Sequence, residues 1–106
     1  MQIQIDASVF ASPTRAFGRV HGVVDLHVVP RQGEVLDFTF AKNGTLPINV
    51  SGFQHRLKVE EVIHPLQSTG SSVILLLEPI VAQSSEDARK ITQYLNAAFG
   101  LYVDEY

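Results

Sequence analysis

Apolar and polar residues alternate along most of the chain with the period of two that β-strands produce. The clearest stretch is Arg19–Val29, where Val20 and Val24 fall on one face and polar residues on the other. Similar stretches are bounded by turn-forming residues, among them Asn43-Gly44. The pattern predicts five strands, over Arg19–Val29, Glu34–Phe40, Leu46–Val50, Gln54–Ile63 and Val73–Val81, with a hairpin loop at Ser68–Ser71.

The N-terminal segment carries two different signals. Ile3 and Ile5 alternate with glutamines, which favours a short strand at the start of the chain. Asp6 is a good N-cap residue, so we expect one helical turn over Asp6–Ala11, ended by Pro13.

The C-terminal part of the chain predicts one amphipathic helix. Ser84 and Asp87 have the spacing of a capping box, and Gly100 is typical of the position just beyond a helix end. The apolar stripe between them comprises Ala88, Ile91, Leu95 and either Ala98 or Phe99. We expect Leu101–Val103 to add a last short strand.

A run of strands followed by a helix is typical of α+β proteins that contain an antiparallel meander. Closing five short strands on themselves would remove the exposed sheet edges. The expected fold is therefore a single domain over residues 1–106, a small antiparallel five-stranded barrel with a C-terminal helix.

The composition narrows the classes of function. The chain is 45% hydrophobic and 18% charged, which fits a globular domain better than a disordered segment. Cysteine is absent, which excludes disulfides, thiolate metal sites and a cysteine nucleophile. The net charge of −3 argues against non-specific binding of duplex nucleic acid.

The chain carries no signal for export or membrane insertion. The first residues lack the basic region and apolar run of a signal peptide. The longest apolar run, Val73–Leu77, is far shorter than the roughly 20 residues of a membrane span. We therefore expect a cytoplasmic protein without a membrane partner.

Four residues around the second predicted strand have a distinctive spacing: Gly33, Phe38, Asn43 and Leu46. This arrangement resembles the first sequence motif of the Sm-like proteins, in which the asparagine belongs to a nucleotide-binding loop. The resemblance implies a small Sm-like or SH3-like barrel, ring-like self-association through edge strands, and binding of single-stranded RNA.

The sequence departs from that family at its second motif. Sm-like proteins have an apolar run followed by Arg-Gly, whereas here Val73–Leu77 is followed by Glu78-Pro79. Thr39 also stands where the family usually has aspartate, and the predicted helix is C-terminal instead of N-terminal. The resemblance therefore favours the barrel more than it favours RNA binding.

Basic residues on one face of the strand Gln54–Ile63 lie near aromatic and amide side chains in the sequence. Cations neutralise phosphates, and aromatic rings stack on bases, so this set is the candidate RNA or ligand surface. Glu60 follows on the same face, and a solvated face of mixed charge is the alternative interpretation. The candidate residues are Asn43, Phe53, His55, Arg56 and Lys58.

The C-terminal region is more aromatic than a terminal helix requires. Tyr94, Tyr102 and Tyr106 either pack on their own domain or dock a second chain. These tyrosines are the candidate interface of a homo-oligomer or of a complex with another protein.

Two groups of residues bear on catalysis or metal binding. Asp25 and His27 lie roughly 7 Å apart along a strand and can just share an ion, but His21 is too far along the same face. The simpler interpretation is the polar outer face of a strand. No Gly-x-Ser-x-Gly elbow is present, so we expect no catalytic residue, no metal and no cofactor.

Glu61 is out of place in the predicted fourth strand, because it falls on the core face with Val59 and Ile63. A β-bulge would turn its side chain outward. A buried carboxyl group would instead have a raised pKa, which is a common property of functional sites.

The sequence thus predicts a non-enzymatic binding or assembly module that self-associates. The first alternative is a single-stranded RNA-binding protein that uses Asn43. The second is a small hydrolase or metal enzyme that uses the histidines.

Overall fold

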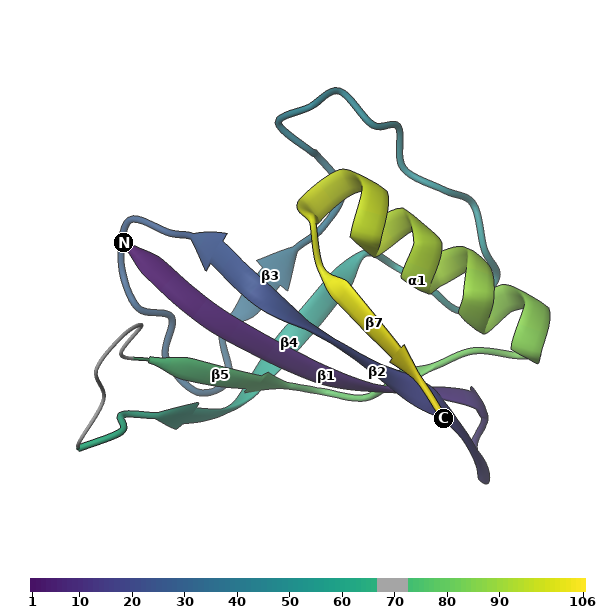
Figure 1. Cartoon of the computed structure of the whole chain (residues 1–106), viewed down its shortest axis with the longest axis horizontal. Helices are drawn as coiled ribbons and strands as arrows, with labels where there is room; N and C mark the ends of the chain where they lie inside the picture. Colours follow the sequence, from purple (N-terminus) through teal and green to yellow (C-terminus); the bar gives the residue numbers. More distant parts are fainter. Residues whose placement is uncertain (67–72) are drawn as a thin grey trace.

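A computed structural model describes residues 1–66 and 73–106, and this part of the chain forms seven strands and one helix (Figure 1). The hairpin loop expected at Ser68–Ser71 lies outside the described residues. The elements are β1 (Gln2–Ser12), β2 (Arg15–Asp25), β3 (Val35–Asp37), β4 (Arg56–Ile63), β5 (Ile74–Leu77), β6 (Ile80–Val81), α1 (Ser85–Phe99) and β7 (Tyr102–Glu105).

The strands form an open mixed sheet in the order β3-β4-β5-β1-β2-β7, with β6 also paired to β1. The pairs β1–β2, β2–β7, β3–β4 and β4–β5 are antiparallel, but β1 runs parallel to β5 and β6. The predicted five-stranded barrel and simple meander are therefore wrong. The first strand lies inside the sheet, where both of its edges are paired, so the sheet ends at β3 and β7.

The helical turn predicted over Asp6–Ala11 is also wrong, because these residues belong to β1. The apolar residues on one face of β1 are all buried: Ile3, Ile5, Ala7, Val9 and Ala11. Asp6 does not cap a helix; it lies on the opposite face, where it forms an ion pair with Arg19 at 3.1 Å. Burial of five alternating side chains outweighs one local capping preference.

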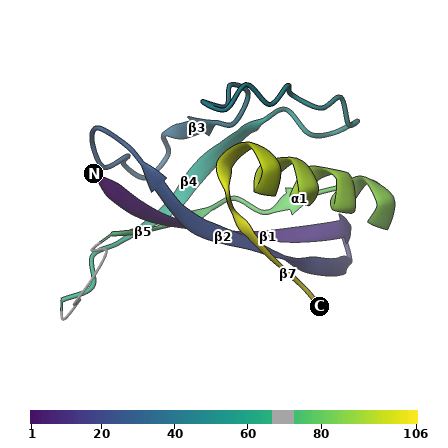
Figure 2. The same cartoon turned by 45° about the horizontal axis from the view of Figure 1, so that its top comes forward.

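The helix α1 lies across the apolar face of the sheet (Figure 2) and was predicted correctly, including both ends. The Ser84 hydroxyl accepts a hydrogen bond from the Asp87 backbone N–H at 3.1 Å, and Gly100 has a φ of 70°. Its buried stripe includes Ile91 and Leu95, which pack in the same core as β1. Within the described ranges, no helix is long and apolar enough to cross a membrane.

A β-bulge in β4 places Glu61 on the surface. Val59 pairs with Leu77, but Glu61 pairs with the next residue, Leu76, so Glu60 is the extra residue between them. Glu61 is exposed while Val59 is fully buried. The bulge suggested by the sequence is confirmed, and the alternative of a buried carboxyl group does not apply.

Most predicted strands differ from the structure in their bounds: β2 lies four residues earlier than predicted at each end, and β3 ends at Asp37 instead of Phe40. Residues 46–50 form no strand, since residues 38–55 make a long connection whose Val50 and Phe53 are buried in the core. The turn at Asn43-Gly44 is present, with Gly44 at φ 80°, but it does not join two strands. The strand predicted over 73–81 is divided into β5 and β6 at residues 78–79.

The division between β5 and β6 follows from Glu78 and Pro79. The Lys58 N–H donates to the Glu78 carboxylate at 2.7 Å, and the Glu78 N–H donates to the Lys58 carbonyl at 2.9 Å. Pro79 has no N–H with which to continue a ladder. The Glu78 carboxylate thus satisfies the backbone of a neighbouring strand.

The strand β7 approaches β2 very closely at Gly18. A Cβ atom at this position would lie 2.2 Å from the Asp104 carbonyl oxygen, a distance that requires the backbone to move. At Gly22 the corresponding nearest atom is the flexible Cδ2 of Leu101, at 3.0 Å. The two glycines therefore allow β7 and Leu101, the residue before β7, to lie against β2.

We predict that Gly18→Ala lowers the free energy of unfolding by about 1–3 kcal/mol, the usual cost of overpacking. Gly22→Ala is the matched control and should cost clearly less, because a side chain can move where a carbonyl in a ladder cannot. Urea titrations followed by circular dichroism would measure both. A Gly18→Ala midpoint equal to that of Gly22→Ala would contradict the proposed backbone contact.

Candidate functional site

An apolar groove of about 550 Å³ lies where the C-terminal end of α1 meets the end of β2, β3 and the connection after it. The groove is the candidate functional site because exposed apolar concavities of this size commonly receive ligands. It is lined by Val23, Val24, Asp25, Leu26, Leu36, Asp37, Phe38, Phe40, Lys42, Asn43, Ala97, Ala98, Phe99 and Gly100.

Aromatic side chains support the wall of the groove. The Phe38 and Phe99 rings meet edge to face, with centroids 5.1 Å apart and an interplanar angle of 88°. Tyr94 is 4% exposed behind them, and its hydroxyl donates to the Phe38 carbonyl. These contacts fix the position of α1 relative to Phe38, the residue that follows β3.

Phe40 lies in the groove lining and is 85% exposed. A large aromatic side chain gains roughly 1.5–3 kcal/mol when it is fully buried, so this exposure leaves apolar contact area open. In a regular strand Phe38 and Phe40 would share a face. β3 ends at Asp37, so the strand geometry does not continue to Phe40, and Phe38 is buried whereas Phe40 is exposed.

Asn43 fixes the connection to the end of α1. Its Nδ2 donates to the Ala97 carbonyl at 2.9 Å, and its Oδ1 accepts from the Thr45 N–H at 3.0 Å. The first bond satisfies one of the carbonyls that a helix end leaves unpaired. Asn43 therefore lies at the groove, as the sequence suggested for a ligand residue, but its amide is already engaged within the chain.

The two carboxylates in the groove lining are paired within the chain, whereas Lys42, which also lines the groove, forms no ion pair with the described residues. Asp25 accepts from the amino group of Met1 at 2.7 Å, which holds the pKa of its carboxyl group below the usual value. The hydroxyl and N–H of Thr39 lower the pKa of Asp37 in the same way, and Arg56 lies 3.7 Å from it. The groove thus presents apolar surface with two paired carboxylates and the exposed Lys42 in its lining.

The five candidate RNA or ligand residues do not form one surface. Phe53 and His55 turn inward, with ring centroids 4.5 Å apart, and the His55 ring meets Tyr94 edge to face. His55 has a φ of 63°, which a residue other than glycine rarely adopts, and its buried Nε2 has no hydrogen-bond partner among the described residues. Arg56 and Lys58 are exposed on the other face of β4.

The three candidate interface tyrosines also separate. Tyr94 is buried in the core, whereas Tyr102 and Tyr106 are 66% and 77% exposed. Tyr102 lies on β7 beside His21, with ring centroids 5.8 Å apart. The two exposed tyrosines are the ones available to a second chain.

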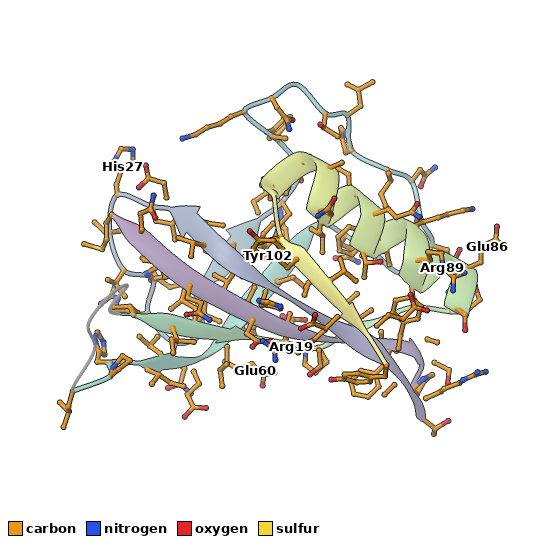
Figure 3. All side chains as sticks on the ribbon, viewed as in Figure 1. Arg19, His27, Glu60, Glu86, Arg89 and Tyr102 are labelled. Carbon is orange, nitrogen blue, oxygen red and sulfur yellow. The ribbon has the colours of Figure 1, made fainter. Side chains whose placement is uncertain are left out.

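No three of the histidine and acidic side chains among the described residues, Asp25 included, are brought together. His21 contacts Asp104 at 2.9 Å, while His27 lies at the end of the sheet near the N-terminus, far from Arg19 and Glu60 (Figure 3). Among the residues that the structure describes, no three histidine or acidic side chains are grouped as a metal site requires.

Sequence reasoning missed most of the groove. Phe40, Lys42 and the end of α1 come from segments that are distant in the sequence and meet only after folding. The one sequence signal for the groove was the apolar run Leu36, Phe38, Phe40. Its last residue, Phe40, lies beyond the end of β3.

No protein-family model, curated protein or solved structure matches this chain. The resemblance to Sm-like proteins therefore stays a prediction, and the site has to be interpreted from its own geometry.

We predict that Tyr94→Phe lowers the free energy of unfolding by about 1 kcal/mol at pH 7, because the Phe38 carbonyl loses its donor. Burial, and secondly the charge of Asp37, raise the pKa of Tyr94. The unfolded tyrosine loses its proton first, from about pH 10, so the stability that the neutral phenol provides is lost as the pH rises through the folded pKa.

The free energies of unfolding of wild type and Tyr94→Phe, measured by urea titration, should therefore become more similar above pH 10. Tyr102→Phe is the matched control and should behave as wild type at pH 7, since Tyr102 is mostly exposed. A difference that stays constant across this pH range would contradict the buried position of the Tyr94 phenol.

Replacing Asn43 should loosen the connection from α1. Asn43→Ala loses the bond to Ala97 and both bonds from Thr45, one from its N–H and one from its hydroxyl, whereas Asn43→Asp keeps the acceptor for Thr45 but loses the donor to Ala97. Asn43→Asp also places a negative charge at the negative end of the helix dipole. We expect each variant to lose about 1 kcal/mol of stability and to exchange the amides of residues 40–45 faster. If the amides of residues 40–45 exchange in Asn43→Asp at the wild-type rate, the bond to Ala97 does not hold the connection in place.

Proposed function

We propose that this protein is a non-catalytic binding module whose groove receives a neutral, apolar side chain of a partner protein. The observation that carries the proposal is the apolar groove beside α1, with Phe40 85% exposed in its lining. Apolar area of this kind is stabilised when a partner removes it from water.

The chemistry of the rim favours a neutral occupant. Asp25 and Asp37 already have cationic or hydrogen-bonding partners in the same chain. A cationic ligand group would have to displace these partners or enter the groove unpaired, and burying an unpaired charge is costly. An anionic group could pair with the exposed Lys42, but an exposed ion pair contributes little and does not offset its burial in the apolar lining. An aromatic or aliphatic side chain needs neither.

Apolar surface beyond the groove favours a protein as the partner. Leu46, in the same connection as Phe40, is 80% exposed. A small molecule that fills the groove would leave Leu46 in water, whereas a protein segment can contact both. Interfaces of this type place one large side chain in a pocket and surround it with weaker contacts.

The RNA-binding alternative has less support. The amide of Asn43 is bonded to Ala97 and Thr45, the Phe53 ring is buried, and Arg56 is close to Asp37. Of the five candidate residues, Lys58 keeps an exposed cationic side chain that forms no ion pair with the described residues.

The test is a backbone-amide NMR titration with N-acetyl-phenylalanine amide, with the lysine and aspartate analogues as charged probes. We expect the phenylalanine probe to shift the amides of residues 36–43 and 97–100, and the charged probes to bind more weakly. Phe40→Ser should raise the Kd about tenfold, which corresponds to roughly 1.4 kcal/mol of lost contact.

Leu66→Ser is the matched control, because Leu66 is 99% exposed and does not line the groove. Its Kd should equal that of wild type. Shifts scattered over the surface, or a Phe40→Ser variant that binds as wild type does, would contradict the proposal. A parallel titration with a short uridine-rich RNA that shifts residues 56–60 in a salt-dependent manner would favour the RNA alternative.

A further inference from the structure

The last residues of β2 form a strand edge that no other described strand pairs with. β7 pairs with β2 between Gly18 and His21, and β2 continues past the start of β7 to Asp25 (Figure 1). On its other side this part of β2 is bonded to β1, and the Leu26 N–H donates to the Met1 carbonyl at 2.8 Å. The end of β2 therefore has a neighbouring strand on one side and an open edge on the other.

The backbone groups of Val23 and Asp25 point toward the open side. In an antiparallel ladder alternate residues bond to the same neighbour. The Leu26 bond assigns the even-numbered residues of this part of β2 to β1, and the Tyr106 N–H, which donates to the Phe17 carbonyl at 3.0 Å, assigns the odd-numbered ones to the β7 side. No backbone hydrogen bond joins Val23 or Asp25 to another described residue on that side. Each of the two thus presents one free donor and one free acceptor.

The apolar groove lies along this same edge. The four residues Val23–Leu26 line it, and so does Gly100, which lies just before β7 begins. The Val24 side chain is on the face of the sheet that α1 covers, because Val24 pairs with the buried Ile3. On a strand added to this edge, the side chain opposite Val24 would therefore enter the groove, and its two neighbours would point to the other face.

We propose that the partner segment binds in this groove as an extended strand antiparallel to β2, with its apolar residue opposite Val24 and an acidic residue toward its N-terminal end. The inference rests on the proposed function and adds the conformation and the charge of the partner to it. The residue before the apolar one bonds to Asp25, and the residue after it bonds to Val23. The segment thus occupies the position next to residues 23–25 that β7 occupies next to residues 18–21.

Backbone hydrogen bonding selects an extended segment over other apolar partners. A partner that covered the groove without pairing would take the polar groups of Val23 and Asp25 out of water, and burying such groups unpaired is costly. An extended backbone presents the complementary donors and acceptors at the same spacing. This side of β2 already accepts an antiparallel strand, since Tyr102 of β7 pairs with His21. The open residues, Val-Val-Asp, also include no proline or lysine, which commonly protect exposed edges.

Charge at one end of the groove favours an acidic residue in the partner. The Asp25 carboxylate accepts from the Met1 amino group at 2.7 Å, and the exposed Lys42 lies in the same groove lining. The hydrogen bond and charge of the Met1 amine, and less strongly the charge of Lys42, lower the pKa of Asp25. Two cations thus act on one carboxylate, which leaves positive charge where the N-terminal part of the segment lies. An acidic side chain there stays in water at the rim, where charges contribute to specificity.

The first test compares two probes on the wild-type chain by backbone-amide NMR titration. N-acetyl-phenylalanine amide presents two backbone groups to β2, and N-acetyl-Thr-Phe-Thr amide presents four. We expect the tripeptide to bind about tenfold more tightly and to shift the amides of Val23 and Asp25. Equal Kd values for the two probes would overturn the strand pairing.

Methylated forms of the tripeptide separate backbone pairing from side-chain contact without altering the protein. A methyl group on the nitrogen of the last threonine removes the N–H that donates to the Val23 carbonyl, and the Kd should rise about tenfold. The same methyl group on the phenylalanine nitrogen replaces an N–H that points away from β2, so this matched control should bind as the parent peptide does. Equal Kd values for the two methylated peptides would overturn the proposal.

The charge of the partner is tested by adding aspartate or lysine before the first threonine. At low salt the aspartate peptide should bind about threefold more tightly than the lysine peptide, as expected for an exposed ion pair. Lys42→Gln should remove most of this difference. Equal Kd values for the two peptides on the wild-type chain would overturn the acidic end of the segment.

These outcomes distinguish failure of the strand from failure of the groove proposal. If N-acetyl-phenylalanine amide shifts residues 36–43 and 97–100 but both methylated tripeptides bind as the parent does, the groove receives an apolar side chain and the strand pairing is wrong. If none of the probes shifts these residues, the groove proposal is wrong, and the strand pairing is wrong with it.

Discussion

The arrangement of this protein depends on burying the apolar face of β1. Five alternating side chains of that strand are almost fully inaccessible, and α1 is the element that covers them. Both edges of β1 are also occupied, by β2 on one side and by β5 and β6 on the other. The end strands β3 and β7 are not paired with each other, so the sheet of the described residues stays open and two edges remain.

The groove and the β7 edge both follow from where α1 ends. Gly100 stops the helix before it reaches the end of β2, which leaves Val24 and Leu26 uncovered beside Phe99. The chain then turns back directly into β7, whose position requires two glycines in β2. One helix C-terminus therefore generates an apolar concavity on one side and an unpaired strand on the other.

Local signals made part of this structure predictable from sequence. The caps at Ser84 and Gly100 are set by neighbouring residues, and a carboxylate on an otherwise apolar strand face indicated the bulge at Glu60–Glu61. The parallel pairing of β1 with β5 depends on residues about 70 positions apart, which periodicity does not reveal. For the same reason Asn43 was found near the site, but its bond to Ala97 and the contribution of Phe99 were not.

The sequence separation between β1 and its cover has a consequence for synthesis. About 70 residues separate the end of β1 from the start of α1. At about 5–20 residues per second, the ribosome needs roughly 4–14 s to make them. During that interval the apolar face of a nascent β1–β2 hairpin has no cover from α1, and exposed apolar surface of this kind makes a folding chain prone to aggregation.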